Sequence, residues 1–326
     1  MPKTSSLLTR RRLLAGGATL LGASVLPTLP ARQAGLPQSK TFIGQERFRQ
    51  VVSKALRENW RDLAMGERVM RFAYEFHGVP YKSYTLEIDD RVEAPSVNLH
   101  GLDCWTFFEV ALGLARMIEF PRPSYAPADL LREIEWTRYR GGRCAGNYLE
   151  RIHYLAEWYF ENEARGNITD LTRELGGAER IRGRQIREMT VLYKHYRYLR
   201  ENPSLRPGMK AQEAMVQGLP VYHIPRSKVA RIESKLRNGD VLGIVTKHHG
   251  GFCSHVGLAT RTKDGVMRIM HASSNSKKVI VDKSISGYLN HYSSHLGLLV
   301  GRPLPRSSAI TDPAEYQKRL RKLKSA

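Results

Sequence analysis

The spacing of apolar residues predicts that the first two thirds of the chain is mainly helical. Residues 104–118 form the most apolar of the helical segments, and residues 127–220 also have a mainly helical pattern, with a helix expected over 184–201. Two earlier groups of apolar side chains recur every three to four residues, as in two amphipathic helices: Phe48, Val51, Val52 and Ala55, then Val69, Met70, Ala73 and Phe76.

The pattern changes after Asp240. Short apolar or β-branched runs, separated by Gly, Asp and Ser, predict strands at 241–246, 255–259, 266–270, 278–281 and 296–300. Helices followed by an antiparallel sheet are typical of the α+β class. We therefore expect an α+β domain in which residues 127–220 are a helical insertion between the helix at 104–118 and the sheet.

Composition supports a folded domain and raises the question of its partners. The chain has 326 residues, of which 41% are hydrophobic, and ordinary Gly and Pro contents exclude collagen-like and wholly disordered chains. The 52 Lys and Arg residues against 31 Asp and Glu give a formal net charge of +21, which suits nucleic acid, anionic lipid or an acidic polymer. Basic and aromatic residues alternate over 193–200, but helical spacing accounts for them, so we expect no nucleic-acid partner.

The first 34 residues have the composition of an export signal. Three arginines, Arg10 to Arg12, precede an apolar stretch rich in Ala and Gly at 13–27, and no acidic residue occurs before residue 35. The paired arginines, with Thr9 before them and two leucines after them, resemble a twin-arginine signal. We expect residues 1–34 to direct export to the periplasm and to be removed, which would leave no stable membrane span.

The other end of the chain is basic. Residues 303–326 are predicted to be a Pro/Ser linker and a basic C-terminal tail, in which Asp312 and Pro313 mark a helix start. This leaves residues 35–302 as a single domain, which we expect to be the catalytic one.

Cys104 is the first candidate for chemistry. It lies where a loop that ends at Asp103 gives way to the predicted helix. The free N–H groups and the positive end of the helix dipole favour a thiolate, which is the nucleophilic form of cysteine. A buried structural cysteine is the alternative, because free cysteines are among the most buried residues.

Two histidines on consecutive predicted strands, His255 and His271, strengthen the catalytic interpretation of Cys104. Adjacent antiparallel strands can present both side chains on one face of the sheet. A histidine beside a cysteine can accept the thiol proton, and a second polar group can orient that histidine. Each histidine alone is more often structural, so the hypothesis of a Cys–His–His site rests on the three residues together.

Five short motifs occur in order along the chain: Pro80-Tyr81, Leu102-Asp103-Cys104, Asn238-Gly239-Asp240-Val241, Ser254-His255-Val256-Gly257 and Met270-His271-Ala272-Ser273. As an ordered set they resemble the NlpC-type cell-wall cysteine hydrolases, which have a papain-like fold with a Cys-bearing helix packed on the sheet that carries the His. A Tyr-x-x-Arg-x-His segment at 148–153, Trp158 and the pair Tyr288-Leu289 resemble the N-acetylmuramoyl-L-alanine amidase-like branch. The similarity covers about residues 65–302.

The resemblance implies a role for each candidate. Cys104 would attack the amide carbonyl, and His255 would be the general base that later protonates the leaving amine. His271 would orient His255, while the Cys104 backbone N–H and Tyr81 would stabilise the oxyanion.

Tyr148 and Arg151 belong to the segment that marks the branch, and we expect them at the substrate cleft. An arginine there suits the carboxylates of a peptide stem through bidentate contacts. The alternative for this Gly- and Arg-rich region, which also contains Arg140 and Arg143, is a solvated loop.

The predicted function is that of an exported cysteine hydrolase of peptidoglycan or muropeptides, cleaving the amide between N-acetylmuramic acid and L-Ala. The alternatives are a stem-peptide endopeptidase that cleaves after D-Glu, a non-catalytic wall-binding module, and another thiol enzyme such as an acyltransferase. A binding module has no need of Cys104, His255 and His271 together. We expect no cofactor and no metal, because His248 and His249 have no carboxylate at ligand spacing.

The chain has two further cysteines. Cys253 precedes His255 by two residues, so strand alternation predicts that both lie on one face. It either packs there or forms a reversible disulfide with Cys104, and we expect packing. Cys144 lies in a Gly-rich loop and has no predicted partner.

Overall fold

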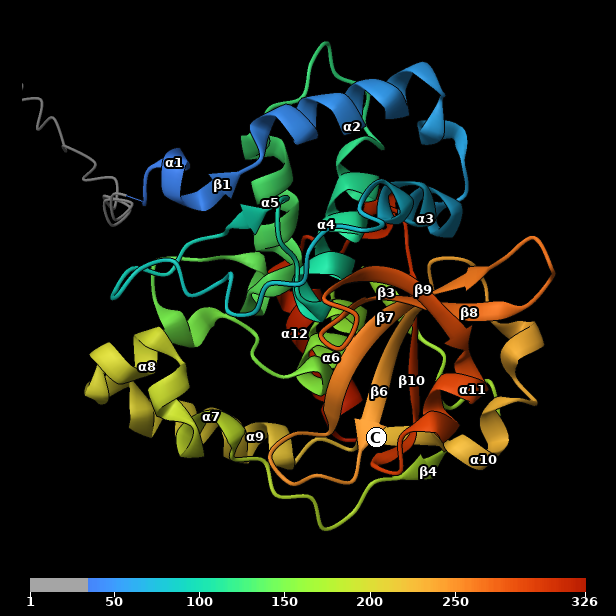
Figure 1. Ribbon diagram of the computed structural model, residues 1–326. Helices are drawn as coiled ribbons and strands as arrows, with labels where there is room; N and C mark the ends of the chain where they lie inside the picture. The colour runs from blue at the N-terminus through green and yellow to red at the C-terminus, as the bar shows by residue number, and fades with distance from the viewer. Residues whose placement is uncertain (1–34) are drawn as a thin grey trace, which may run out of the picture. The chain divides into compact units, whose positions relative to one another are not determined.

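A computed structural model describes residues 35–326, and Figure 1 shows the arrangement of their elements. The predicted export signal at residues 1–34 lies outside the described residues. The α-helices are α1 (Gln38–Thr41), α2 (Gln45–Arg57), α3 (Met65–Glu75), α4 (Cys104–Met117), α5 (Pro127–Arg138), α6 (Leu155–Ala164), α7 (Glu188–Val191), α8 (Arg197–Glu201), α9 (Arg206–Gln217), α10 (Arg226–Val229), α11 (Ile285–His291) and α12 (Pro313–Lys324). The strands are β1 (Phe42–Ile43), β2 (Val97–Asn98), β3 (Ile168–Asp170), β4 (Glu179–Arg180), β5 (Tyr222–Pro225), β6 (Val241–Thr246), β7 (Cys253–Arg261), β8 (Met267–Ser273), β9 (Lys278–Ser284) and β10 (His295–Pro303).

An antiparallel sheet lies between two hydrophobic cores. Its strands follow the order β4-β5-β10-β6-β7-β8-β9, with β3 paired to β10. Along β6, Val241 and Val245 belong to the core that contains α4, whereas Leu242 and Ile244 belong to the core on the other face, where α10 and α11 pack. Side chains alternate between the faces of a strand, so a strand covered on both faces is apolar throughout, as the sequence of β6 is.

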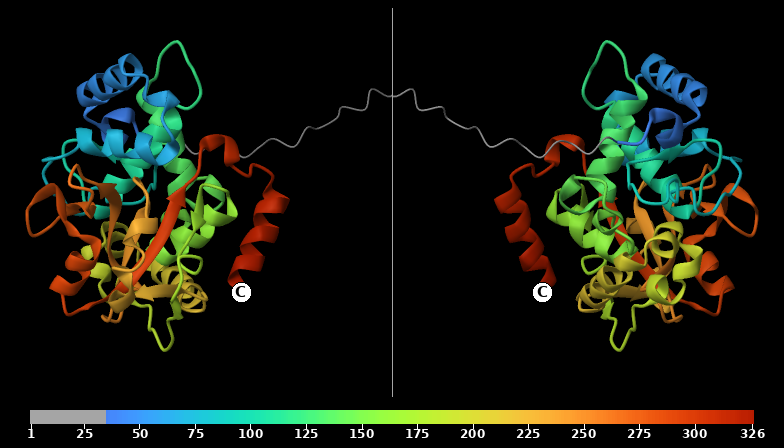
Figure 2. Two further views of the ribbon diagram at one scale, coloured as in Figure 1. Left: turned by 90° about the vertical axis from the view of Figure 1, so that its right-hand side faces the viewer. Right: turned by 90° about the vertical axis from the view of Figure 1, so that its left-hand side faces the viewer.

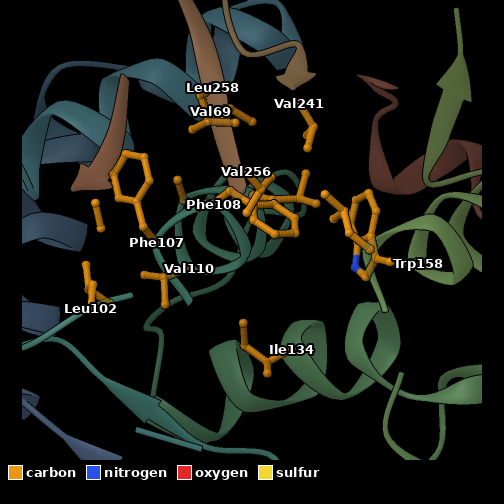
Figure 3. Packing of buried hydrophobic residues seen from close by; sticks show 14 of the residues in the cluster. Val69, Leu102, Phe107, Phe108, Val110, Ile134, Trp158, Val241, Val256 and Leu258 are labelled. Carbon is orange, nitrogen blue, oxygen red and sulfur yellow. The ribbon is translucent and has the colours of Figure 1, made fainter. Parts of the chain in front are cut away.

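Helix α4 is the internal helix of the domain. Its residues from Thr106 to Met117 are buried, and α3, α5, β7 and β8 surround it. Figure 3 shows Phe108 beside Val256 of β7 and Trp158 of α6, and the Phe108 and Trp158 rings meet edge to face at 5.0 Å. A helix that is apolar on all sides is stable only when it is enclosed. This packing fixes the start of α4 against the sheet.

The structure confirms the five predicted strands and lengthens four of them. The run 241–246 coincides with β6, and the other four correspond to β7, β8, β9 and β10. The antiparallel sheet and the α+β class are therefore as predicted. The insertion at 127–220 is less helical than expected, because β3 and β4 lie within it and β3 pairs with the far end of β10.

The prediction of one helix over 184–201 is wrong. The segment contains α7, a 3₁₀ turn at Tyr193–His195, and α8. Tertiary contacts decide its conformation, since Tyr198 stacks on Tyr148 at 4.6 Å and the Arg197 guanidinium pairs with Asp90. Such contacts override a modest helix preference.

The C-terminal residues form the end of a strand and a helix. Strand β10 extends to Pro303, and α12 then packs along α6 (Figure 2). Tyr316 is buried there, and its hydroxyl donates a hydrogen bond to Glu161 Oε2 at 2.6 Å. Asp312 caps α12 by accepting a hydrogen bond from the Ala314 N–H, as the sequence predicts. Apart from Arg306, the basic residues of this segment are thus carried on a docked amphipathic helix.

For residues 35–326, none of the helices has both the length and the apolar character that crossing a membrane requires.

Candidate active site

The thiol of Cys104 is held at the first residue of α4. Asp103 is the N-cap, and its Oδ1 accepts a hydrogen bond of 2.7 Å from the Thr106 N–H. The Thr106 hydroxyl in turn accepts a hydrogen bond of 3.0 Å from the Asp103 N–H. This reciprocal capping box satisfies two backbone donors and fixes where the helix begins. The position of Cys104 is therefore determined by its immediate sequence neighbours.

The structure brings His255 and His271 into direct contact. His255 Nε2 lies 2.6 Å from His271 Nδ1, and the two rings meet edge to face. His271 is buried, and its Nε2 lies 3.3 Å from Asp282 Oδ2. The ring of Tyr288 packs against the His271 ring with centroids 5.2 Å apart. Adjacent strands thus present both histidines on one face, as predicted.

Gly257 permits the close approach of the two strands that carry these histidines. A Cβ atom there would lie 2.7 Å from Ile269 and 2.9 Å from the Met270 carbonyl oxygen on β8. Any larger residue would push β7 away from β8. The glycine of the Ser-His-Val-Gly motif is therefore required by the close packing of β7 against β8.

A pocket of about 540 Å³ lies between Cys104 and the first of the two histidines. Cys104 and His255 both line it, and Cys253 lies beside them at the start of β7. The remaining walls come from three segments that are distant in the sequence: the loop at 81–87, residues 151–155, and residues 188–196. The fold therefore assembles the candidate site from both halves of the chain.

In the resting site, the Cys104 thiol and the His255 ring are both favoured in their uncharged forms. Burial, with a smaller contribution from the Asp103 carboxyl, raises the pKa of the Cys104 thiol to about 12. Hydrogen bonds from the Val256, Trp105 and Cys104 N–H groups act in the opposite direction but are outweighed. Burial also holds the pKa of His255 well below its ordinary value, and His271 and His295 lower it further. The thiolate expected from the helix N-terminus is therefore not the favoured resting form.

Tyr81 lines the same pocket as Cys104. It forms a parallel bridge with Leu102. Burial raises its pKa to about 12, with a further contribution from the Cys104 side chain. The phenol is therefore protonated at neutral pH and able to donate a hydrogen bond. Its role at an oxyanion stays a prediction.

Arg151 and Tyr148 support the pocket wall. The buried Arg151 guanidinium donates hydrogen bonds to Glu87 Oε1 at 2.5 Å and to the Leu86 carbonyl at 3.1 Å, and it also pairs with Glu93. The hydroxyl of Tyr148, itself 1% exposed, donates to Glu87 Oε1 at 3.2 Å. With these donors engaged, contact of Arg151 with a substrate carboxylate stays a prediction.

The sequence did not indicate the residues at the pocket rim. Tyr84 is 51% exposed, adopts a positive φ of 58°, and meets the Tyr196 ring edge to face at 6.1 Å. The Tyr196 hydroxyl donates a hydrogen bond to Glu188 Oε1 at 3.2 Å. A strained, exposed aromatic residue at a pocket is a candidate substrate contact. No local motif announces it, because its position depends on how the 81–87 loop meets the 188–196 segment.

Asp282 is the other residue that sequence reasoning missed. It lies on β9, two residues beyond Ile280, which pairs with His271. Alternation along a strand places Ile280 and Asp282 on the same face. Knowledge of the strand register was needed to see this, although the alternation itself was visible in the sequence.

The three cysteines are free thiols in the structure. Cys253 packs against the hydrophobic core, and a register shift in the β6–β7 ladder separates it from His255. Within residues 35–326, no group of three or more His, Cys, Asp or Glu side chains is arranged to hold a metal ion.

A second pocket, of about 290 Å³, lies between α6, β3 and the C-terminal residues. Its polar lining includes Glu163, Asp170 and Arg173, and neither a cysteine nor a histidine reaches it. Of these two pockets, the one at Cys104 is lined by a thiol and an imidazole.

Comparison with known proteins finds a matching family and similar solved structures. A family model described as AmiA-like, N-acetylmuramoyl-L-alanine amidase-like, matches residues 71–296. An N-acetylmuramoyl-L-alanine amidase from Bacteroides uniformis is similar in structure, with 27% identity, a TM-score of 0.66, and coverage of 74% of this chain and 99% of that one. A Bacteroides fragilis protein described as a xylanase candidate is 29% identical, with a TM-score of 0.63 and coverage of 71% and 98%.

A Legionella pneumophila protein is 20% identical and has a TM-score of 0.58, with coverage of 80% of this chain and 97% of that one, which shows a shared fold. No curated protein matches the chain.

Proposed function

Because the chain belongs to the AmiA-like, N-acetylmuramoyl-L-alanine amidase-like family, we propose that it is a cysteine hydrolase that cleaves the amide between N-acetylmuramic acid and L-Ala. The observation that carries this proposal is the shared pocket, in which Cys104 at a capped helix start lies with His255, itself bonded to His271. A cysteine at a helix start, followed along the chain by two histidines in contact, supports an NlpC-type, papain-like mechanism.

The first half of the reaction forms a thioester. Substrate in the pocket places the lactyl carbonyl of muramic acid against Cys104 Sγ. His255 accepts the thiol proton as sulfur attacks the carbonyl carbon, and the Cys104 backbone N–H and the Tyr81 hydroxyl donate to the oxyanion. The tetrahedral intermediate collapses with cleavage of the C–N bond, and the proton on His255 passes to the L-Ala amine. The stem peptide leaves with a free N-terminus.

The second half regenerates the enzyme. Water attacks the thioester carbonyl while His255 accepts its proton, and the thiolate leaves and is reprotonated. Because the resting pair is neutral, the proton transfer accompanies the attack instead of preceding it. His271 holds His255 through the bond of 2.6 Å during both halves.

Hydrolysis of an amide bond fits this pocket better than hydrolysis of a glycosidic bond. A glycosidase generally needs two carboxyl groups that flank the scissile bond. Three carboxyl groups line the pocket, and all three have structural partners: Asp103 caps α4, Glu87 pairs with Arg151, and Glu188 accepts a hydrogen bond from the Tyr196 hydroxyl. We also propose that export by the twin-arginine route delivers the protein to the periplasm, where its substrate would lie.

Product analysis tests the proposal. The full chain and its Cys104→Ala variant are incubated with defined muropeptides, and the products are weighed by mass spectrometry. Cys144→Ser is the matched control, because Cys144 lies outside the pocket. Release of the intact stem peptide by wild type and Cys144→Ser, but not by Cys104→Ala, is expected.

Two results would point elsewhere. Release of L-Ala-D-Glu would identify the stem-peptide endopeptidase. Binding of wall fragments with no product from any of them would support the wall-binding module and exclude the hydrolase hypothesis.

A further inference from the structure

The hydrogen bonds behind His255 form a chain of defined direction. An ionised carboxylate only accepts hydrogen bonds, so Asp282 Oδ2 requires the proton of His271 on Nε2. A neutral His271 with its proton on Nε2 has a lone pair on Nδ1. His255 must then supply the proton of the 2.6 Å bond from its own Nε2. The lone pair of His255 is left on Nδ1, the nitrogen that remains for the thiol.

We propose that Asp282 is a positioning residue that selects the tautomers of His271 and His255, so that His255 presents an unprotonated Nδ1 to Cys104. The inference rests on the proposed function in one respect, namely that His255 is the general base. In the opposite tautomers His255 Nδ1 would carry a proton and would be unable to accept one from sulfur.

The local structure orients the Asp282 carboxylate. Its Oδ1 accepts a hydrogen bond of 2.7 Å from the Lys283 N–H, which turns Oδ2 toward His271. The β8–β9 ladder has a register shift between Arg268 and Met270, where β9 carries Asp282 and Lys283. A bulge of this kind re-aims side chains beside a site. The carboxylate is 20% exposed, whereas His271 is 3% exposed.

The charges around the histidine pair make Asp282 its counter-ion. His255 lines the same pocket as Cys104 and feels the charges of His271 and His295, and His271 faces Asp282 and the ring of Tyr288. Lys283 Nζ lies 3.8 Å from Asp282 Oδ1, on the carboxylate oxygen that points away from the pair. Of the charged groups that act on His271, Asp282 is the one that favours its protonated form. The positive charge that His255 gains during catalysis is therefore balanced across His271.

The tautomers can be observed directly, without any substrate. The ring nitrogens of the full chain are read by two-bond ¹H–¹⁵N correlation after ¹⁵N-histidine labelling at pH 8, with assignment by His255→Gln and His271→Gln. Both rings are expected to carry their proton on Nε2 in wild type. In Asp282→Ala the acceptor is gone, and a mixture of tautomers is expected. A wild-type His271 protonated on Nδ1, or tautomers unchanged in Asp282→Ala, would overturn the proposal.

The kinetic test separates positioning from mere support of the fold. Asp282→Ala is expected to lower kcat by about 10- to 100-fold, less than the loss of a group bonded directly to a catalytic base, with KM unchanged because Asp282 does not line the pocket. Asp282→Asn keeps an acceptor and is expected to recover part of kcat. In both variants the acid limb of kcat/KM is expected to move to lower pH by about half a unit or more, since the counter-charge is absent.

Asp264→Ala is the matched control, because this exposed carboxylate pairs with Arg268 at the β7–β8 turn. An acid limb that stays in place in both Asp282 variants, or that moves equally in Asp264→Ala, would overturn the proposal. In a His271→Asn background, Asp282→Ala is expected to have no further effect on the acid limb, and an additive shift would contradict action through His271. If no wall fragment is cleaved, the proposed function fails, while the tautomer measurement still decides this inference.

Discussion

The environment of Cys104 sets the chemistry of the site at the scale of single residues. Helix-terminal N–H groups would lower the pKa of the thiol, but burial beside the Asp103 carboxyl has the larger and opposite effect. The His255 ring, buried and bonded to a second histidine, is also held neutral. In the proposed mechanism, charge separation is therefore created only when substrate is bound, as the oxyanion and the imidazolium form together.

Alkylation of Cys104 tests this resting state. The rate of modification by iodoacetamide should rise about tenfold per pH unit from pH 6 to pH 9, because the thiolate is a small fraction that grows up to a pKa of about 12. Peptide mapping by mass spectrometry separates Cys104 from Cys144 and Cys253. A rate that is flat from pH 5 to pH 8 would reveal a preformed thiolate–imidazolium pair.

Tyr81 provides a second test at the residue scale. Tyr81→Phe removes one hydroxyl at the pocket and should lower kcat by about 10- to 100-fold, with KM and the melting temperature nearly unchanged, if that hydroxyl donates to the oxyanion. Tyr74→Phe removes a hydroxyl that bonds to Thr260 outside the pocket and serves as the control. Equal kcat values for the two variants and wild type would show that the Tyr81 hydroxyl does not stabilise the oxyanion, which would then be stabilised by backbone N–H groups.

At the scale of elements, two helices begin with the same residue type in different settings. Asp103 caps the buried helix α4, and Asp312 caps the docked helix α12. Only the first cap fixes the position of a candidate nucleophile, which makes the pair a natural comparison.

Asp103→Ala should destabilise the protein by about 1–2 kcal/mol and also lower kcat strongly, because the start of α4 is no longer fixed. Asp312→Ala should destabilise it by about 0.5–1 kcal/mol, through the α12 terminus alone, and leave kcat unchanged. Urea unfolding and steady-state kinetics give the two quantities. Equal kcat values for both variants would separate the cap of α4 from catalysis.

The elements also show where sequence reasoning succeeds. Strand β6 was predictable because both of its faces are buried, so its whole sequence is apolar. The segment 184–201 was not, because Tyr198 and Arg197 make contacts with residues about 50 and 107 positions earlier that no local pattern encodes. Asp282 was missed for a related reason, since its contact with His271 follows from the register of two strands.

At the scale of the whole molecule, neutral buried histidines couple stability to pH. Burial holds the pKa of His153 well below its ordinary value, with Arg151 and Arg140 lowering it further. In the unfolded chain the same side chain takes up a proton below about pH 6.5. The unfolded state then binds more protons than the folded state, so this residue's contribution to stability is complete above about pH 6.5 and is lost as pH falls.

His153→Gln isolates this effect and keeps a donor for the Tyr148 carbonyl, to which His153 Nε2 is bonded at 3.0 Å. Between pH 6 and pH 5, the free energy of unfolding of wild type should change by about 1.4 kcal/mol per pH unit more steeply than that of the variant. Replacement of the exposed His77 by Gln should leave the slope unchanged. Parallel slopes for wild type and His153→Gln in urea titrations would show that His153 is protonated in the folded state.

Part of the net positive charge of the chain can be assigned to one element of the structure. The formal charge of +21 suggested an acidic partner, and part of it lies on α12, whose apolar side packs against α6. The fold places Cys104 and His255 in one pocket and His271 beside His255, and their catalytic roles stay a prediction. The positions of Tyr84 at the pocket and of Asp282 beside His271 depend on tertiary structure.

The most direct test of the proposed chemistry is the mass of the acyl-enzyme. The full chain is mixed with a defined muropeptide, quenched in acid within milliseconds to seconds, and digested so that the peptide containing Cys104 can be weighed. The proposed amidase predicts a thioester on Cys104 that carries the muramic acid side of the cleaved amide. A thioester that carries L-Ala-D-Glu, or substrate turnover with Cys104 never acylated, would contradict it.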